Sequence, residues 1–186
     1  MTPVGVVLAG GAARRMGGAK ATALLAGRPL VTWALDALRA GGLEELAVAA
    51  KASTPLPALD VQVWVEPEEP RHPLAGVRAA LERAGGRAIV TVPVDLPLVP
   101  AEVLRALARA EGCAVVRSGG RLQPLVARFE AGVAVPVSGR AVDAVLALEP
   151  LVLEVSGEGF LNVNAPSDLA AAAHALALRS RGGGGS

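Results

Sequence analysis

The sequence is poor in several residue types, and each scarcity narrows the classes of protein that it can encode. Cys113 is the single cysteine, so no disulfide can form within the chain, and we expect a cytoplasmic protein. No apolar run approaches the roughly 20 residues of a membrane-spanning helix, and no basic segment precedes the N-terminal apolar run. We therefore predict neither a membrane span nor a signal peptide. The formal net charge of +1 gives no general attraction to nucleic acid or to membranes.

Lysine and asparagine are also scarce, which makes the few that remain informative. Of the 18 basic residues only Lys20 and Lys51 are lysines. Asn162 and Asn164 are the only asparagines, and both lie in one short segment near the C-terminus. We therefore consider Lys20 and Asn164 as candidates for ligand contacts.

Short β-branched runs alternate with Ala/Leu-rich stretches of helical character. We predict strands at 4–9, 46–50, 61–65, 88–92, 114–117, 122–129 and 151–155. We predict helices at 29–40, 74–84, 100–110, 139–148 and 166–178. This order indicates one three-layer α/β domain over residues 1–178 with a mostly parallel sheet. A hairpin around Gly119-Gly120 adds a small antiparallel element near one edge. By composition, residues 179–186 are a flexible tail.

In such sheets ligands bind at the carboxyl ends of the strands, and here the first of these loops is rich in glycine. It reads GGAARRMGGAK over residues 10–20. The glycines allow close approach to a ligand, and exposed backbone N–H groups can cradle phosphates. Arg14, Arg15 and Lys20 add the positive charge that a pyrophosphate requires in a transition state. The P-loop and GxGxxG patterns are both absent. A tight, solvated turn is the alternative interpretation.

A second candidate is Asp95, which follows the apolar strand 88–92 in the segment VTVPVDLPLVP. Pro93 and Pro97 stiffen this loop and so restrict the carboxylate. One carboxylate together with substrate phosphates and waters is an ordinary ligand set for Mg²⁺. The alternative is an aspartate that only caps or turns the chain before Pro97.

Several segments together resemble the molybdenum cofactor guanylyltransferases, within the Rossmann-like nucleotidyltransferases. The similarity rests on LAGGAARRMGG with Lys20 and LLAGRPL, on DLPLVP at 95–100 and on PLAG at 73–76. It continues in QPLVARF at 123–129 and in LNVNAPSDL at 161–169. The resemblance implies a nucleotide-diphospho-sugar transferase-like fold. It also implies transfer of GMP from GTP to the terminal phosphate of molybdopterin, giving the guanine dinucleotide cofactor and pyrophosphate.

The same resemblance implies roles for individual residues. The catalytic residues would be Lys20, Arg15 and Asp95, with Asp95 as the ligand of Mg²⁺. The nucleotide-binding residues would be Leu8, Ala9, Gly10, Gly11, Gly17, Gly18, Lys20, Glu66, Leu74, Ala75, Gly76 and Asp95. Residues near the acceptor would be Asn164, Gln123 and Pro124. GTP and a molybdopterin-type cofactor would be the substrates, and other proteins of molybdenum cofactor biosynthesis would be transient partners.

The chain departs from the family pattern at two positions. Ala19 stands where the family usually has Asp before the lysine, and Ala49 stands where some members carry a nucleotide-binding Asn. These losses leave two alternative functions open. One is a related nucleotidyltransferase that uses CTP or a sugar-1-phosphate, and the other is a nucleotide-binding module without catalysis.

Several site residues also have ordinary structural alternatives. Glu66 could be a solvated loop charge, with Glu68 and Glu69 as rivals in the same loop. Asn164 could cap the C-terminal helix, and Gln123 could belong to a plain edge strand. His72 is interpreted as a loop residue. Arg117, Arg121 and Arg128 could meet an anionic acceptor or lie on the surface.

Overall fold

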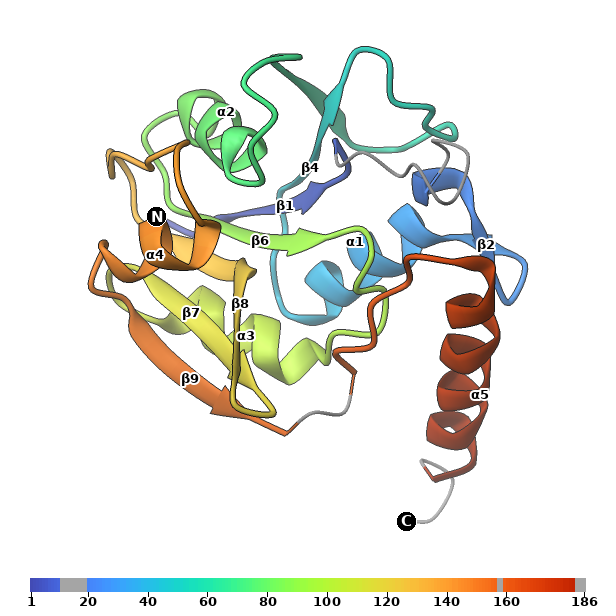
Figure 1. The fold of residues 1–186 in the computed structure, drawn as a ribbon. Coiled ribbons are helices and arrows are strands. Elements are labelled where there is room, and N and C mark those ends of the chain that lie inside the picture. The colour runs from blue at the N-terminus through green and yellow to red at the C-terminus, as the bar shows by residue number, and fades with distance from the viewer. Residues whose placement is uncertain (11–19, 157–158, 183–186) are drawn as a thin grey trace.

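The main sheet has a nearly uniform strand direction. The computed structural model describes residues 1–10, 20–156 and 159–182, and within them seven strands lie in the order β5-β4-β1-β6-β8-β7-β9 (Figure 1). Their bounds are β1 Val4–Leu8, β4 Leu46–Lys51, β5 Gln62–Glu66, β6 Ile89–Pro93, β7 Ala114–Ser118, β8 Arg121–Phe129 and β9 Leu151–Val155. All neighbouring pairs are parallel except those of β8, which runs antiparallel to β6 and to β7. The prediction of a mostly parallel sheet is confirmed.

The predicted hairpin is present near one edge of the sheet, and one further strand lies outside it. β7 and β8 pair through a turn at Gly119 and Gly120, which both have positive φ. β8 inserts next to β6, and β9 pairs with β7 to form the outermost strand on that side. The antiparallel hairpin therefore lies directly inside the edge strand β9.

Helices cover both faces of the sheet, as the alternation along β1 requires. Val4, Val6 and Leu8 belong to the core under α2 (Ala75–Arg83) and α4 (Ala141–Leu146). Val7 and Ala9 belong to the core under α1 (Leu30–Ala40) and α3 (Ala101–Arg109). Two apolar cores separated by one sheet are the three-layer arrangement predicted from the sequence.

The C-terminal ends of four parallel strands, β1, β4, β5 and β6, lie side by side along one end of the sheet. Leu8 at the end of β1 pairs with Ala49 of β4 on one side and with Pro93 of β6 on the other. Lys51 at the end of β4 pairs in turn with Glu66 at the end of β5. The segments that follow these strands must therefore lie together, and this end of the sheet holds the candidate site.

A small second sheet, missed at the level of sequence, connects the short 3-10 helix Lys20–Thr22 to α1. It consists of β2 (Leu24–Leu25) and β3 (Arg28–Pro29), paired antiparallel. Ala26 and Gly27 form the turn with φ of 49° and 77°, the left-handed values that a tight two-residue hairpin needs. Two-residue strands are too short to show a period-two pattern, which explains why the sequence did not reveal them.

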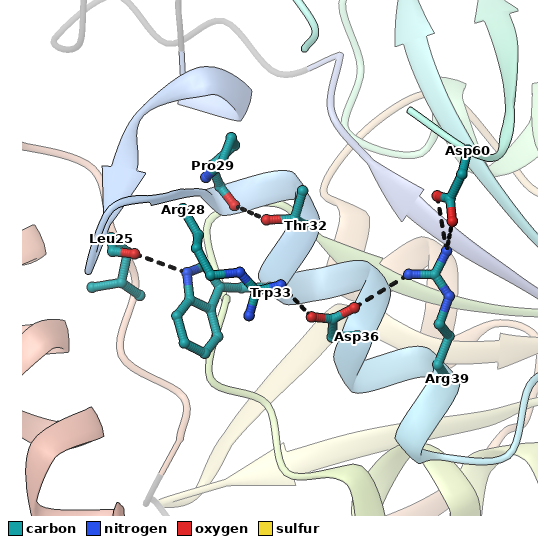
Figure 2. Close-up of polar contacts among 8 residues, drawn as sticks. All are labelled: Leu25, Arg28, Pro29, Thr32, Trp33, Asp36, Arg39 and Asp60. Carbon is teal, nitrogen blue, oxygen red and sulfur yellow. Dashed lines mark hydrogen bonds and ion pairs between the residues drawn. The ribbon is translucent and has the colours of Figure 1, made fainter. Parts of the chain in front are cut away.

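Side chains of α1 hold this hairpin in place, as Figure 2 shows. The Trp33 indole N–H donates to the carbonyl oxygen of Leu25 at 3.0 Å, and the Arg28 guanidinium lies 4.7 Å from the centre of the Trp33 ring. Arg28 also pairs with Asp36, one helical turn further along. The segment that carries Lys20 is thus anchored to a core helix on its C-terminal side.

The C-terminal helix α5 (Pro166–Gly182) is longer than expected. It continues four residues past Leu178, so the first four residues of the predicted tail are helical, while residues 183–186 lie outside the described part. Figure 1 shows α5 beside β2, where Leu169, Ala172 and Leu176 join the core of α1 and α3. Among the described residues, no helix combines the length and the hydropathy needed to cross a membrane.

Candidate active site

A cavity of about 530 Å³ opens at the carboxyl ends of β1, β4, β5 and β6. Among the described residues, its wall is formed by the ends of these strands, by the loops after β4, β5 and β6 and by the start of α2. The polar lining includes both lysines of the chain and three carboxylates. The predicted site residues that line it are Leu8, Gly10, Lys20, Glu66, Ala75, Gly76 and Asp95. The rule that ligands bind at strand ends therefore located the cavity correctly.

Three of the predicted residues form what we call the Lys20 cluster: Lys20, Asp95 and Asn164. The Lys20 ammonium donates to Asn164 Oδ1 at 2.8 Å and lies 3.4 Å from Asp95 Oδ2. The Lys20 and Asp95 side chains keep 16% and 26% of their surface exposed. The cluster thus combines segments 75 and 144 residues apart into one charged group that faces the cavity.

Backbone contacts fix the two acceptors of the Lys20 cluster. The N–H of Val163 donates to the carbonyl oxygen of Asp95 at 2.8 Å, which ties the C-terminal segment to the loop after β6. The Asp168 carboxylate accepts from the N–H groups of Asn164 and Ala165 at 2.8 and 2.9 Å. Asp168 therefore caps the start of α5, and the Asn164 side chain points to Lys20 instead of capping the helix.

The second feature is a tight niche, the Glu66 niche, made by Glu66, Gly10 and Gly76. Glu66 is only 8% exposed. A Cβ atom on Gly10 would lie 1.7 Å from Glu66 Oε1, and one on Gly76 would lie 2.3 Å from Glu66 Oε2. Both distances are far below van der Waals contact, so neither position can carry a side chain while Glu66 keeps this place. The interpretation of Glu66 as a solvated loop charge is wrong.

The electrostatics of the niche come from its burial and from two charged neighbours. Burial raises the pKa of Glu66 because it penalises the charged form; Lys51 acts in the opposite direction, and Glu68 adds to the rise. Glu68 itself is exposed and bonds to Ser53 and Lys51. The rival carboxylates of the loop therefore lie at its surface, while Glu66 turns inward.

Sequence reasoning missed Lys51, the last residue of β4, which lines the cavity beside Glu66. Its ammonium donates to the carbonyl oxygens of Glu68 at 2.6 Å and Pro67 at 3.2 Å. Two signals pointed to it: lysine is rare in this chain, and the residue ends a strand of the parallel sheet.

His72 is a loop residue, as predicted, and it links two loops at the rim of the cavity. Its Nδ1 accepts from the N–H of Leu74 at 3.2 Å, so the other ring nitrogen carries the hydrogen and donates to the carbonyl oxygen of Gly139 at 3.2 Å. These contacts join the start of α2 to the loop before α4.

Some predicted residues lie near the cavity without lining it. The N–H of Ala9 is bonded to the carbonyl oxygen of Ala49 within the sheet, so this N–H is not available to a ligand. Leu74 is fully buried in the core. In β8 the cavity is lined by Leu125, the residue that follows Gln123 and Pro124. The predicted residues Gly11, Arg15, Gly17 and Gly18 lie outside the described part of the chain.

Two of the three arginines considered for the acceptor have other partners, and the third, Arg121, is exposed at the start of β8. Arg117 pairs with Glu154 at 2.6 Å. Arg128 is 9% exposed and bonds to the carbonyl oxygens of Gly112 and Ala108, at the end of α3. Arg128 therefore has a structural role, and neither of its two alternatives, an acceptor contact or a surface position, describes it.

A divalent metal fits this site only if the substrate supplies most of its ligands. Within the described ranges, no three His, Cys, Asp or Glu side chains are grouped so that they could hold a metal ion. Asp95 offers one accessible carboxylate at the cavity. Mg²⁺ and similar hard cations are commonly held by one or two carboxylates together with substrate phosphates and waters. The donor set suits a metal that arrives with a nucleotide.

A mostly parallel sheet, helices on both faces and a charged cavity at the strand ends define an α/β domain of the nucleotidyltransferase type. Comparison with known proteins agrees. Residues 5–148 match the family described as MobA-like NTP transferase domain. The chain is 39% identical to the molybdenum cofactor guanylyltransferase of Cereibacter sphaeroides, with 90% of this chain and 94% of that protein covered. The chain belongs to the MobA-like NTP transferases and, within them, to the family of molybdenum cofactor guanylyltransferases.

Solved structures support the fold. Rv0371c from Mycobacterium tuberculosis H37Rv is similar with a TM-score of 0.76 at 23% identity, covering 94% of this chain and 98% of that one. A complex of Rv0371c with manganese is similar with a TM-score of 0.73 at 23% identity, over the same shares of the two chains. At this level of identity the likeness concerns the fold.

Proposed function

We propose that this enzyme transfers GMP from GTP to the terminal phosphate of molybdopterin and releases pyrophosphate. The family membership supports the reaction, and the Lys20 cluster is the observation that carries the assignment of the site. An ammonium and a carboxylate face one cavity at the strand ends. A nucleoside triphosphate with a divalent cation requires this pattern, because the ammonium can face the phosphates and the carboxylate can face the cation.

In the proposed reaction an oxygen of the acceptor phosphate forms a bond to the α-phosphorus of GTP. The bond from that phosphorus to the bridging oxygen breaks, and pyrophosphate leaves with the electron pair. The second pKa of a phosphate monoester is near 6, so the acceptor is largely ionised at neutral pH. No general base is needed, and the protein contributes position and charge.

Within this reaction Asp95 would hold the divalent metal, and Lys20 would neutralise the phosphates of the leaving group. Bound metal supplies positive charge against the phosphate oxygens. We propose Mg²⁺, and the manganese complex of Rv0371c supports use of a divalent ion in this fold. Arg15 and the glycines Gly11, Gly17 and Gly18 are proposed to contact the phosphates as well.

The Glu66 niche is proposed to receive the nucleoside. A carboxylate accepts hydrogen bonds from ribose hydroxyls or from the N–H groups of guanine, and Ala75 and Gly76 leave room for a base. Leu8, Ala9 and Gly10 would contribute through backbone atoms, and Leu74 would support the niche from the core. Asn164, Gln123 and Pro124 are proposed to border the acceptor, and the cytoplasm is the proposed location.

The test is pyrophosphate release by the purified protein with Mg²⁺ and molybdopterin, with GTP and CTP in parallel assays. We expect release with GTP and formation of the guanine dinucleotide cofactor. Preference for CTP would overturn the assignment of the base while keeping the reaction type. No release with either nucleotide, by a protein that still binds GTP, would overturn transfer to this acceptor.

A further inference from the structure

Both lysines of this chain line the same cavity, although arginine supplies the other 16 basic residues. Lys20 belongs to the Lys20 cluster described above. Lys51 lies on the other side of the cavity, at the end of β4, and touches neither Asp95 nor Asn164 in the contacts among the described residues. The Lys20 cluster therefore does not explain why a second ammonium lies beside the Glu66 niche.

The contacts of Lys51 all reach the loop that carries Glu66. Its ammonium donates to the carbonyl oxygens of Pro67 and Glu68 and lies 3.8 Å from Glu68 Oε2. The Lys51 side chain keeps only 18% of its surface exposed. The side chain thus joins the end of β4 to the residues directly after Glu66, and it brings a positive charge next to a buried carboxylate.

We propose that Lys51 is a positioning residue for the nucleotide: it holds the loop after β5 and balances the buried negative charge of Glu66, and so acts on GTP binding and not on the transfer step. This inference rests on the proposed function only in naming GTP as the ligand. Its chemistry is that of a carboxylate that accepts hydrogen bonds from a nucleoside at both oxygens while it is ionised, and that turns one of these oxygens into a donor when it is protonated.

The charges around Glu66 allow an electrostatic effect of Lys51 on Glu66 to be distinguished from a role in which Lys51 only holds the loop. Lys51 from β4 favours the ionised form of Glu66, whereas Glu68 from the same loop disfavours it. β1 and α2 present Gly10 and Gly76 to the carboxylate and contribute no charge there. Lys20, Asp95, Arg71 and His72 line other parts of the same cavity. Removal of Lys51 and removal of Glu68 should therefore have opposite effects on Glu66.

The experiment measures GTP binding by calorimetry from pH 5.5 to pH 8.5, with Mg²⁺ and without acceptor, for wild type, Lys51→Met and Glu68→Gln. Lys51→Met should raise the dissociation constant about tenfold, the size of a lost charge-assisted contact, and most strongly at low pH. The pH at which binding fails should move up in Lys51→Met and down in Glu68→Gln. Dividing the dissociation constant of each variant by that of wild type at the same pH cancels the effect of the titration of GTP itself.

Both variants abolish the Lys51–Glu68 ion pair, so a role confined to that pair would shift binding in the same direction in both, and this result would overturn the proposal. Unchanged binding in Lys51→Met would overturn it as well. Lys51→Arg keeps the charge and should restore most of the affinity. In Lys51→Met, kcat with molybdopterin should change by less than about threefold, because the phosphates are contacted elsewhere.

A matched control is Arg105→Met. Arg105 also donates to a backbone carbonyl, that of Ala40 at 2.7 Å, but it lies away from the cavity. It should leave GTP binding unchanged, while melting temperatures confirm that all variants fold. If wild type binds GTP without transferring it, the proposed function fails and the Lys51 test still stands. If wild type does not bind GTP, both fail.

Discussion

The two sides of the cavity are built by different means. The Lys20 cluster draws on three segments far apart in the sequence, and its side chains are partly exposed and joined by hydrogen bonds. The Glu66 niche joins the ends of two strands to the start of α2, and its carboxylate is nearly buried against two glycines. One side is defined by charge in contact with solvent, and the other by close packing around a charge.

This difference suggests how each side can change. Charged groups in a partly exposed cluster can exchange partners when phosphates and a metal arrive, because their hydrogen bonds are few and accessible. A carboxylate packed against backbone at Gly10 and Gly76 cannot move without disturbing the strands. We therefore expect substitutions in the Lys20 cluster to affect the rate, and those in the Glu66 niche to affect binding and folding stability.

The largest effect is expected from Asp95→Asn, which removes the negative charge of the proposed metal ligand, one of the two partners of Lys20. The rate of pyrophosphate release should fall about a thousandfold, because the divalent metal that would balance the charge on the phosphates in the transition state is held less well. The melting temperature should change little, since the backbone contact from Val163 to Asp95 remains. Near wild-type turnover would remove Asp95 from the mechanism. Asp36→Asn, in the exposed network of Figure 2, serves as the control.

The next effect in size is that of Lys20→Met. We expect kcat/KM for GTP to fall about a hundredfold, through both weaker binding and slower transfer, because an ammonium against the leaving pyrophosphate is lost. Steady-state kinetics over a range of GTP concentrations separate the two contributions. Unchanged kinetics would mean that other groups, such as Arg15, neutralise the phosphates without Lys20.

Packing in the Glu66 niche is tested by Gly76→Ala. The new methyl group would collide with Glu66 Oε2, so GTP affinity should fall about tenfold or more and the melting temperature should also drop. Glu66→Asp is one methylene shorter and should make room for the methyl group. The double variant should then be more stable than the sum of the two single changes predicts, which a double-mutant cycle measures. Strict additivity would show that the two side chains do not meet.

The sequence predicted much of this architecture because the signals were local and regular. The apolar runs around Val7, Val48 and Val92 are buried strands, and their order determined the three-layer fold. The position of Asp95 at the end of a buried strand was enough to place it at the cavity. Periodicity therefore predicted the sheet, and the strand-end rule predicted where the cavity lies.

What the sequence did not reveal depends on contacts between distant segments or on very short elements. The role of Asn164 was undecided because helix capping explained it equally well, until Asp168 proved to make the cap. The inward turn of Glu66 required knowledge that both Gly10 and Gly76 abut it. Lys51 was overlooked although lysine is rare and the residue ends a strand, because its contacts with the backbone carbonyls of Pro67 and Glu68 leave no pattern in the sequence.

A smaller effect on the rate is expected from Asn164→Ala. The lost hydrogen bond orients Lys20 and is an ordinary side-chain contact, so kcat/KM should fall about fivefold. The melting temperature should stay near that of wild type, because Asp168 holds the backbone at this position. Asp168→Ala is the complementary variant and should lower the melting temperature by removing the cap. Equal losses of stability in both variants would contradict this division of roles.

The smallest effect concerns folding stability, and it tests the cost of the buried charge. Burial raises the pKa of Glu66 above its ordinary value of 4.5. A carboxyl group with a raised pKa contributes stability that is fully present below the unfolded pKa and is lost as pH rises through the folded pKa. Glu66→Gln removes that loss, so its melting temperature relative to wild type should increase between pH 4.5 and pH 8, while GTP affinity falls. A constant difference in melting temperature across this range would show that the ionised Glu66 carboxylate does not destabilise the folded state. The Glu66 niche would then tolerate its charge as well as the more exposed Lys20 cluster does.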